Sequence, residues 1–230
     1  MTNRTITAAM TRTIDVPGAT IAYDVRAGDI GGRPLMLIGS PMGAGGFATL
    51  ASQFPERTVI TYDPRGVERS RKDDDTSEST PEQHADDIHA VISAVGVGPV
   101  DLFASSGGAV NALALVARHP EDVRTLVAHE PPLAALVNDR HAAFAATEDI
   151  RDKPDVEALR GAATRIIVAV GAESDGEMAH RGGEAVASRL GVEPVVFPSG
   201  HGGFLGGEYG QTGEPDAFGA KLREVLAEGS

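Results

Sequence analysis

Residues 100–115 read VDLFASSGGAVNALAL, and this stretch decides the fold. An apolar run leads into two serines and two glycines, and an alanine-rich segment follows. This order predicts a strand, a sharp turn and a helix. A serine on such a turn has a strained backbone, and its neighbours two positions away on either side must be small so that strand and helix can approach.

Ser106 is the serine that satisfies this requirement, because its neighbours two positions away are Ala104 and Gly108. Ser105 does not, because its neighbour on the strand side is the bulky Phe103. We therefore interpret Ser106 as a candidate nucleophile. The other interpretation is a helix N-cap serine with glycines for close packing, so partner residues elsewhere in the chain must decide.

Length and composition limit what this serine can belong to. A chain of 230 residues with 41% hydrophobic residues predicts one domain over residues 1–230. The net charge of −13 argues against a nucleic-acid or anionic-membrane partner. The absence of cysteine excludes disulfides, thiol catalysis and cysteine metal sites. Residues 1–13 lack the apolar core of a signal peptide, so a cytoplasmic location is expected.

Apolar and helical segments alternate along the chain. The dipeptide Pro17-Gly18 predicts a hairpin of two short strands. Apolar runs without clean alternation are typical of strands buried on both faces of a parallel sheet. These runs are 34–38, 58–62, 100–103, 125–128, 165–170 and 194–197, and the expected helices are 81–95, 108–119, 177–190 and 217–227. The alternation predicts an α/β fold. The polar stretch 69–80 is interpreted as a solvated loop.

The chain resembles the α/β-hydrolase family. The segment Ala104-Ser105-Ser106-Gly107-Gly108 is similar to the family's nucleophile elbow, and residues 63–70, DPRGVERS, resemble its DxRGxGxS stretch, with Glu68 in place of a glycine. The resemblance implies a mostly parallel central sheet with helices on both faces and an N-terminal antiparallel hairpin. It also implies a short lid segment at about 133–164, with room for two short helices near 139–147 and 154–162.

A serine nucleophile requires a base, which this fold places in a loop after the last strand. His201 fits this position, because it lies in PSGHGGF directly after the run 194–197. The other histidines fit the base position less well: His84 and His89 are expected on a surface helix, His119 near a helix end, and His141 and His180 in polar surroundings.

The base in turn needs a carboxylate that orients it, and three acids qualify. Glu173 and Asp175 follow the strand 165–170, the position that most members of the resembled family use. Glu130 ends the preceding strand, and two prolines fix its exit. We favour Glu130 because it is the more confined. The adjacent His129 is expected to point to the opposite face.

The resemblance also implies two backbone N–H donors for an oxyanion. One is Gly107, the residue after the nucleophile. The second comes from the loop GSPMG at 39–43, with Ser40 as the expected donor and Met42 as the alternative. Six apolar residues are candidates for an acyl pocket: Met42, Phe47, Leu133, Leu136, Phe144 and Phe204.

These residues together predict a cofactor-free serine hydrolase that cleaves a small-molecule carboxylic ester or related acyl bond. The segment GAGGFA at 43–48, followed by Asp63, also matches a dinucleotide pattern and makes an NAD(P)-binding oxidoreductase one alternative. A catalytically silent binding protein of the same fold is another. No pair of histidines falls at metal-ligand spacing beside a carboxylate, so no metal site is expected. The sequence does not indicate an oligomeric state.

Overall fold

The computed structural model describes residues 8–29, 32–74, 76–133 and 155–228. Within them, one sheet contains β1 (Met10–Val16), β2 (Ala19–Arg26), β3 (Leu35–Ile38), β4 (Val59–Tyr62), β5 (Arg71–Lys72), β6 (Val100–Ser105), β7 (Val123–His129), β8 (Arg165–Gly171) and β9 (Val195–Phe197). The helices are α1 (Ala48–Ser52), α2 (Pro81–Val95), α3 (Gly107–Arg118), α4 (Val156–Gly161), α5 (Met178–Leu190) and α6 (Pro215–Ala227), with 3-10 turns η1 (Ala44–Phe47), η2 (Pro120–Asp122) and η5 (Glu208–Gly210).

The strand order is β1-β2-β4-β3-β6-β7-β8-β9, with the short β5 paired to β2. The strands β1 and β2 form the expected antiparallel hairpin, and β2 also runs antiparallel to β4. In the remaining part of the sheet, β4-β3-β6-β7-β8-β9, all neighbouring strands are parallel. The predicted α/β class and its N-terminal antiparallel hairpin are therefore confirmed. A parallel sheet brings the carboxyl ends of its strands to one edge, where ligands bind in such folds.

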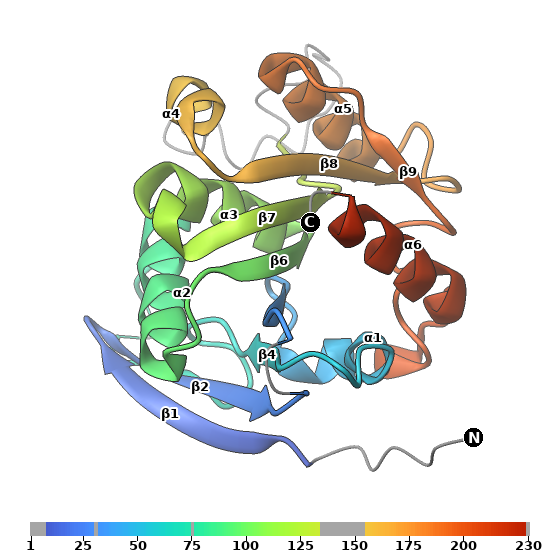
Figure 1. Cartoon of the computed structure of the whole chain (residues 1–230). Coiled ribbons are helices and arrows are strands. Elements are labelled where there is room, and N and C mark those ends of the chain that lie inside the picture. The colour runs from blue at the N-terminus through green and yellow to red at the C-terminus, as the bar shows by residue number, and fades with distance from the viewer. Residues whose placement is uncertain (1–7, 30–31, 75, 134–154, 229–230) are drawn as a thin grey trace.

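Helices cover both faces of the sheet, as Figure 1 shows: α2 and α3 lie on one face, and α1 and α6 on the other. Alternate strand residues supply the two cores. In β6, Leu102 packs with α2 and α3, whereas Phe103 packs with α1 and α6. All four residues of β3 and of β4 are buried. This burial on both faces explains why these strands read as continuous apolar runs.

Helix α2 begins where the sequence predicts. The Thr80 hydroxyl accepts a hydrogen bond from the Gln83 N–H at 3.3 Å, and the Gln83 side chain accepts one from the Thr80 N–H at 3.0 Å. This reciprocal capping satisfies two backbone donors that would otherwise lack partners. Gly96, at φ 69°, ends the helix in a left-handed conformation.

The interpretation of residues 69–80 as a solvated loop was partly wrong. Arg71 and Lys72 form β5 and pair with Thr20 and Ala19 of β2. Arg69 donates to the buried carboxylate of Asp63 through Nε at 2.6 Å. The polar composition of this stretch therefore also serves ion pairing and an edge strand.

The expected lid falls largely on residues 134–154, which lie outside the described part of the chain, as do the pocket candidates Leu136 and Phe144. The second of its two expected helices corresponds to α4. Leu159 of α4 is 3% exposed and belongs to the core cluster that α3 and α5 also form. The lid itself stays a prediction. None of the helices in the described ranges is long and apolar enough to cross a membrane.

Candidate active site

Ser106 lies at the turn from β6 into α3, with φ 57° and ψ −130°. Close packing dictates the small residues around it. A Cβ on Gly108 would come 2.7 Å from Gly39 Cα, and one on Gly107 would come 2.7 Å from the Ser40 carbonyl oxygen. Both distances are too short for side-chain atoms. The glycines therefore allow α3 to approach the loop after β3, and the strained turn holds the serine at the carboxyl end of β6.

The adjacent serine has a different environment. Ser105 belongs to β6, is 1% exposed, and has its hydroxyl 3.2 Å from Nδ1 of His129. Its backbone is part of the strand ladder with β7. The strained turn thus belongs to Ser106 alone of the two.

Glu130 directly follows β7, where it takes a positive φ of 47° and is fully buried. One of its carboxylate oxygens, Oε1, accepts a hydrogen bond from the Gly171 N–H at 2.8 Å and another from the Ser174 hydroxyl. These donors come from β8 and the turn after it. The carboxylate is therefore fixed at the carboxyl edge of the sheet.

The second carboxylate oxygen, Oε2 of Glu130, lies 2.6 Å from Nδ1 of His201. The imidazole follows β9, and its side chain is 39% exposed. The structure thus brings together two of the residues singled out in the sequence, although they are 71 positions apart. The other two candidate acids, Glu173 and Asp175, are exposed, and Glu173 accepts a hydrogen bond from the Ser199 hydroxyl at 3.3 Å.

The carboxyl group of Glu130 is held ionised. Burial by itself would raise its pKa, but hydrogen bonds from His201, Ser174 and the Gly171 N–H outweigh burial and lower the pKa to about 2. At neutral pH a buried negative charge therefore faces Nδ1 of His201. Such a charge fixes the orientation of an imidazole and stabilises its protonated form.

A cavity of about 440 Å³ opens at this edge of the sheet, and both Ser106 and His201 line it. Its wall is mainly apolar with a few polar groups, as is usual for small-molecule sites. The lining residues are Ser40, Pro41, Met42, Val67, Glu68, Ser105, Ser106, His201, Gly202, Phe204, Leu205, Tyr209 and Gln211. Among these described residues, Glu68 is the only carboxylate and none is Lys or Arg.

Four of the six residues expected in an acyl pocket are described. Met42 and Phe204 line the cavity. Phe47 instead packs in the core, where its ring stacks on that of Phe204 at 5.3 Å, and Leu133 joins the core on the other face of the sheet. For these two the simpler interpretation as core residues was the right one.

Two side chains next to Glu130, those of Ser174 and His180, were not recognised from the sequence. Ser174 donates to it, and His180 lies 3.7 Å from its Oε1 and 3.4 Å from the Ser174 hydroxyl. His129 is fully buried among aromatic rings, including Phe218 at 5.3 Å. Burial lowers the pKa of His129 to about 4, so it is neutral at physiological pH. Ser174 and His180 are both more than 40 positions from Glu130 along the chain, so no local spacing marks them.

Three residues that line the cavity, Glu68, Ser106 and Tyr209, have a strained backbone. Among the described residues, the positive-φ residues other than glycine are Glu68, Ser106, Glu130, Ser199 and Tyr209. Glu68 occupies the position where the resembled family has glycine, at φ 47°, and its carboxylate accepts a hydrogen bond from the Tyr209 hydroxyl at 2.8 Å. Strain of this kind persists where the surrounding structure enforces it, commonly at functional sites.

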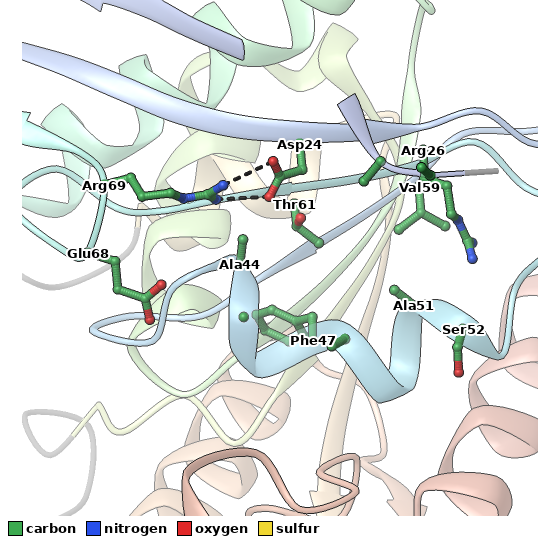
Figure 2. A pocket seen from close by; sticks show the side chains of 14 residues that line it. Asp24, Arg26, Ala44, Phe47, Ala51, Ser52, Val59, Thr61, Glu68 and Arg69 are labelled. Carbon is green, nitrogen blue, oxygen red and sulfur yellow. Dashed lines mark hydrogen bonds and ion pairs between the residues drawn. The ribbon is translucent and has the colours of Figure 1, made fainter. Parts of the chain in front are cut away.

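A second hollow of about 500 Å³ lies between β2 and β4 on one side and η1 and α1 on the other (Figure 2). Arg69 forms a double ion pair with Asp24 along its wall, at 2.9 and 3.1 Å. Asp63, the acid that completes the dinucleotide pattern in the sequence, has a buried carboxylate that accepts hydrogen bonds from the Ala44 N–H at 2.8 Å and from Arg69. Its hydrogen-bonding capacity is thus used within the fold.

Comparison with known proteins identifies the family. Residues 33–183 match the family model described as alpha/beta hydrolase fold. The chain therefore belongs to the α/β-hydrolase fold family. This result confirms the resemblance read from residues 63–70 and 104–108.

Individual relatives agree with this assignment. The uncharacterized hydrolase YraK of Bacillus subtilis (strain 168) is 35% identical over 153 residues, which make up 64% of this chain and 55% of that protein. The chain thus spans about half the length of this curated relative.

Among solved structures, a thermophilic esterase from Thermogutta terrifontis superposes with a TM-score of 0.70 at 18% identity, over 96% of this chain and 98% of its own. An enzyme that degrades N-acyl homoserine lactones superposes with a TM-score of 0.72 at 19% identity, over 95% of this chain and 100% of its own. At these identities the likeness shows a shared fold.

Proposed function

We propose that this protein is a serine hydrolase that cleaves a carboxylic ester or a related acyl bond through a covalent acyl-enzyme. Ser106 is the nucleophile, His201 the base and Glu130 the acid that orients it. One observation carries the proposal: Ser106 and His201 line one cavity, and Nδ1 of His201 is 2.6 Å from the buried Glu130 carboxylate.

The proposed reaction follows from the protonation states. Because Glu130 is ionised, its carboxylate accepts a hydrogen bond from the Nδ1–H of His201, and Nε2 is left free to act as a base. Nε2 takes the proton of the Ser106 hydroxyl as Oγ attacks the substrate carbonyl carbon. The imidazolium then gives this proton to the departing alcohol. Water, deprotonated by the same nitrogen, hydrolyses the acyl-enzyme and releases the acid.

Backbone donors supply the remaining part of the proposed site. The N–H of Gly107 and that of Ser40 would bind the oxyanion, with Met42 as the alternative to Ser40. The close packing of Gly107 on Ser40 supports this pairing, because a Cβ at Gly107 would lie 2.7 Å from the Ser40 carbonyl oxygen. Two donors on one rigid contact need no reorganisation during the reaction.

The cavity supports a small neutral substrate. Its wall combines apolar side chains such as Met42 and Phe204 with the carboxylate of Glu68. The proposed reaction needs no cofactor. The solved relatives include an esterase and a lactone-degrading enzyme, so esters and lactones are the first substrates to test. A cytoplasmic location remains a prediction from the sequence.

The test is turnover of p-nitrophenyl esters from acetate to octanoate by the wild type and by Ser106→Ala. We expect the variant to lose activity by at least about 10⁴-fold, because removing a triad member lowers kcat by roughly 10⁴- to 10⁶-fold. The matched control is Ser105→Ala, which should keep activity within about tenfold. Equal turnover in wild type and Ser106→Ala would reject the proposed nucleophile. Absence of turnover in both, with no lactone hydrolysis, would favour the catalytically silent binding protein.

A further inference from the structure

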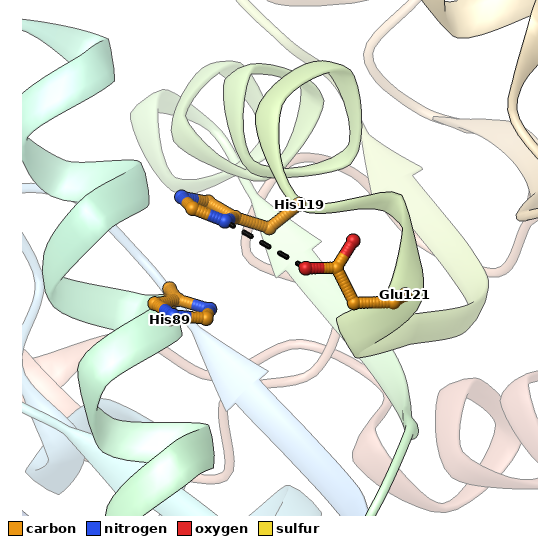
Figure 3. A group of neighbouring side chains, drawn as sticks. All are labelled: His89, His119 and Glu121. Carbon is orange, nitrogen blue, oxygen red and sulfur yellow. Dashed lines mark ion pairs between the residues drawn. The ribbon is translucent and has the colours of Figure 1, made fainter.

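Two histidines and a glutamate meet on the surface far from the proposed active site. His89 projects from α2, His119 follows the last turn of α3, and Glu121 belongs to η2 (Figure 3). The two imidazole rings stack with centroids 4.0 Å apart and planes inclined by 12°. One ligand atom from each of the three residues lies within 4.8 Å of the others. The sequence did not predict this group, because the chain brings α2 and η2 together only in the fold.

Carboxylates orient both imidazoles. Nδ1 of His89 lies 2.7 Å from Oδ2 of Asp122, and Nε2 of His119 lies 3.1 Å from Oδ1 of Asp86. When each of these nitrogens carries the proton, Nε2 of His89 and Nδ1 of His119 keep their lone pairs. Metal-binding histidines characteristically donate their other N–H to a carboxylate in this way. The pattern thus resembles two metal ligands with their supporting acids in position.

The local charge favours a divalent cation. Three carboxylates, those of Asp86, Glu121 and Asp122, surround the rings, and one guanidinium, that of Arg118, pairs with Asp86 at 3.0 Å. Two imidazoles with one carboxylate suit Zn²⁺ and its transition-metal neighbours better than Mg²⁺ or Ca²⁺, which prefer oxygen ligands.

We propose that His89, His119 and Glu121 form a binding site for Zn²⁺ or a similar transition-metal ion, with water completing the coordination. Nδ1 of His119 is 3.9 Å from Oε1 of Glu121. In a tetrahedral site with bonds of about 2.0–2.1 Å, ligand atoms lie roughly 3.3 Å apart. The ligands must therefore close in by about 0.6–1.5 Å. The exposure of Glu121, 69%, and of His89, 37%, leaves room for the side-chain rotation that this requires.

The position of the site predicts its effect. Asp122 directly precedes β7 and Glu130 directly follows it. A strand of this length spans roughly 20 Å, so the metal would bind at the opposite end of β7 from the proposed triad. A bound ion would tie α2 to the junction of α3 and β7. We therefore expect the bound ion to stabilise the fold and to leave turnover unchanged, provided that zinc does not also occupy the proposed active site. The metal-site proposal does not depend on the proposed reaction.

Zinc binding to the full chain is the test, measured by calorimetric titration and by the melting temperature in ZnCl₂ or MgCl₂. Zinc at about 100-fold above its Kd should raise Tm by about 5–10 °C, and magnesium should not. His89→Gln and His119→Gln should each weaken zinc binding at least tenfold. The matched control Glu157→Gln removes an exposed carboxylate from α4 and should bind as the wild type does.

Absence of saturable zinc binding, or equal binding by wild type and both histidine variants, would overturn the metal-site proposal. If a variant fails to fold, imidazole ¹⁵N NMR of the wild type decides instead. Zinc should shift Nε2 of His89 and Nδ1 of His119, and shifts confined to His201 or other histidines would overturn the proposal.

Discussion

Replacing Glu130 with glutamine should abolish most of the activity while leaving the fold intact. In the native protein Oε1 accepts hydrogen bonds from the Gly171 N–H and the Ser174 hydroxyl, and Oε2 faces Nδ1 of His201. The amide of the variant keeps its carbonyl oxygen toward the two donors. Its NH₂ group then faces Nδ1, which must become the acceptor, and the proton moves to Nε2.

An imidazole with its proton on Nε2 cannot deprotonate Ser106. In the serine proteases, the corresponding change from acid to amide lowers kcat about 10⁴-fold. The same loss here would correspond to about 5 kcal/mol in activation free energy. The loss of the ionised carboxylate should lower stability by no more than about 3 kcal/mol, because the amide keeps the bonds to Gly171 and Ser174. The variant should therefore remain cooperatively folded at 25 °C.

The assay is kcat and KM on p-nitrophenyl acetate at pH 8, with thermal unfolding measured by circular dichroism. The matched controls are Glu173→Gln and Asp175→Asn, the exposed acids that the sequence also allowed. Both should keep kcat within about tenfold. The reasoning would be refuted if Glu130→Gln retained kcat within tenfold of the wild type, or if one of the control variants lost activity instead.

The pKa of Glu130 is lowered to about 2, so its ionised form should contribute about 3 kcal/mol to stability above pH 4.5. This contribution should disappear as the pH falls toward 2. Urea unfolding from pH 7 to pH 3 should therefore show a shrinking difference in the free energy of unfolding between wild type and Glu130→Gln. Glu68 faces the cavity, and two unit charges about 4 Å apart in water interact by about 1 kcal/mol. Glu68→Gln should therefore raise kcat/KM for a carboxylate-bearing ester about fivefold relative to a neutral ester. An unchanged ratio of the two kcat/KM values would contradict this. The buried ion pair of Arg65 and Asp87 is bidentate, with distances of 2.7 and 2.6 Å. Asp87→Ala should therefore lower the free energy of unfolding by about 3–5 kcal/mol. A loss below 1 kcal/mol in urea unfolding would show that water solvates the guanidinium in the variant.

The parts of the fold that sequence could predict are those that local chemistry decides. The elbow was readable because sterics near Ser106 demand small residues at Ala104 and Gly108. The strands β3 and β6 were readable because burial on both faces removes the polar alternation. Glu130 was a candidate because an apolar strand ran into it and prolines followed.

The remaining features depend on contacts between distant segments. Ser174 reaches Glu130 from the turn after β8, and His180 reaches it from α5, 44 or more positions along the chain. Arg71 and Lys72 form a strand only because Ala19 and Thr20 offer an edge. His89 and Asp122 meet across 33 positions. No periodicity or motif in the sequence indicates such long-range contacts. The composition of each segment taken alone favoured interpretation as a solvated loop or surface.

The central claim is that Ser106 becomes covalently acylated, and intact-protein mass spectrometry with a fluorophosphonate tests it most directly. We expect one adduct per chain, located by peptide mapping on Ser106 rather than on Ser105. The adduct should be absent in Ser106→Ala and strongly slowed in Glu130→Gln. A wild-type protein that stays unlabelled, or that carries the adduct on another residue, would contradict the account.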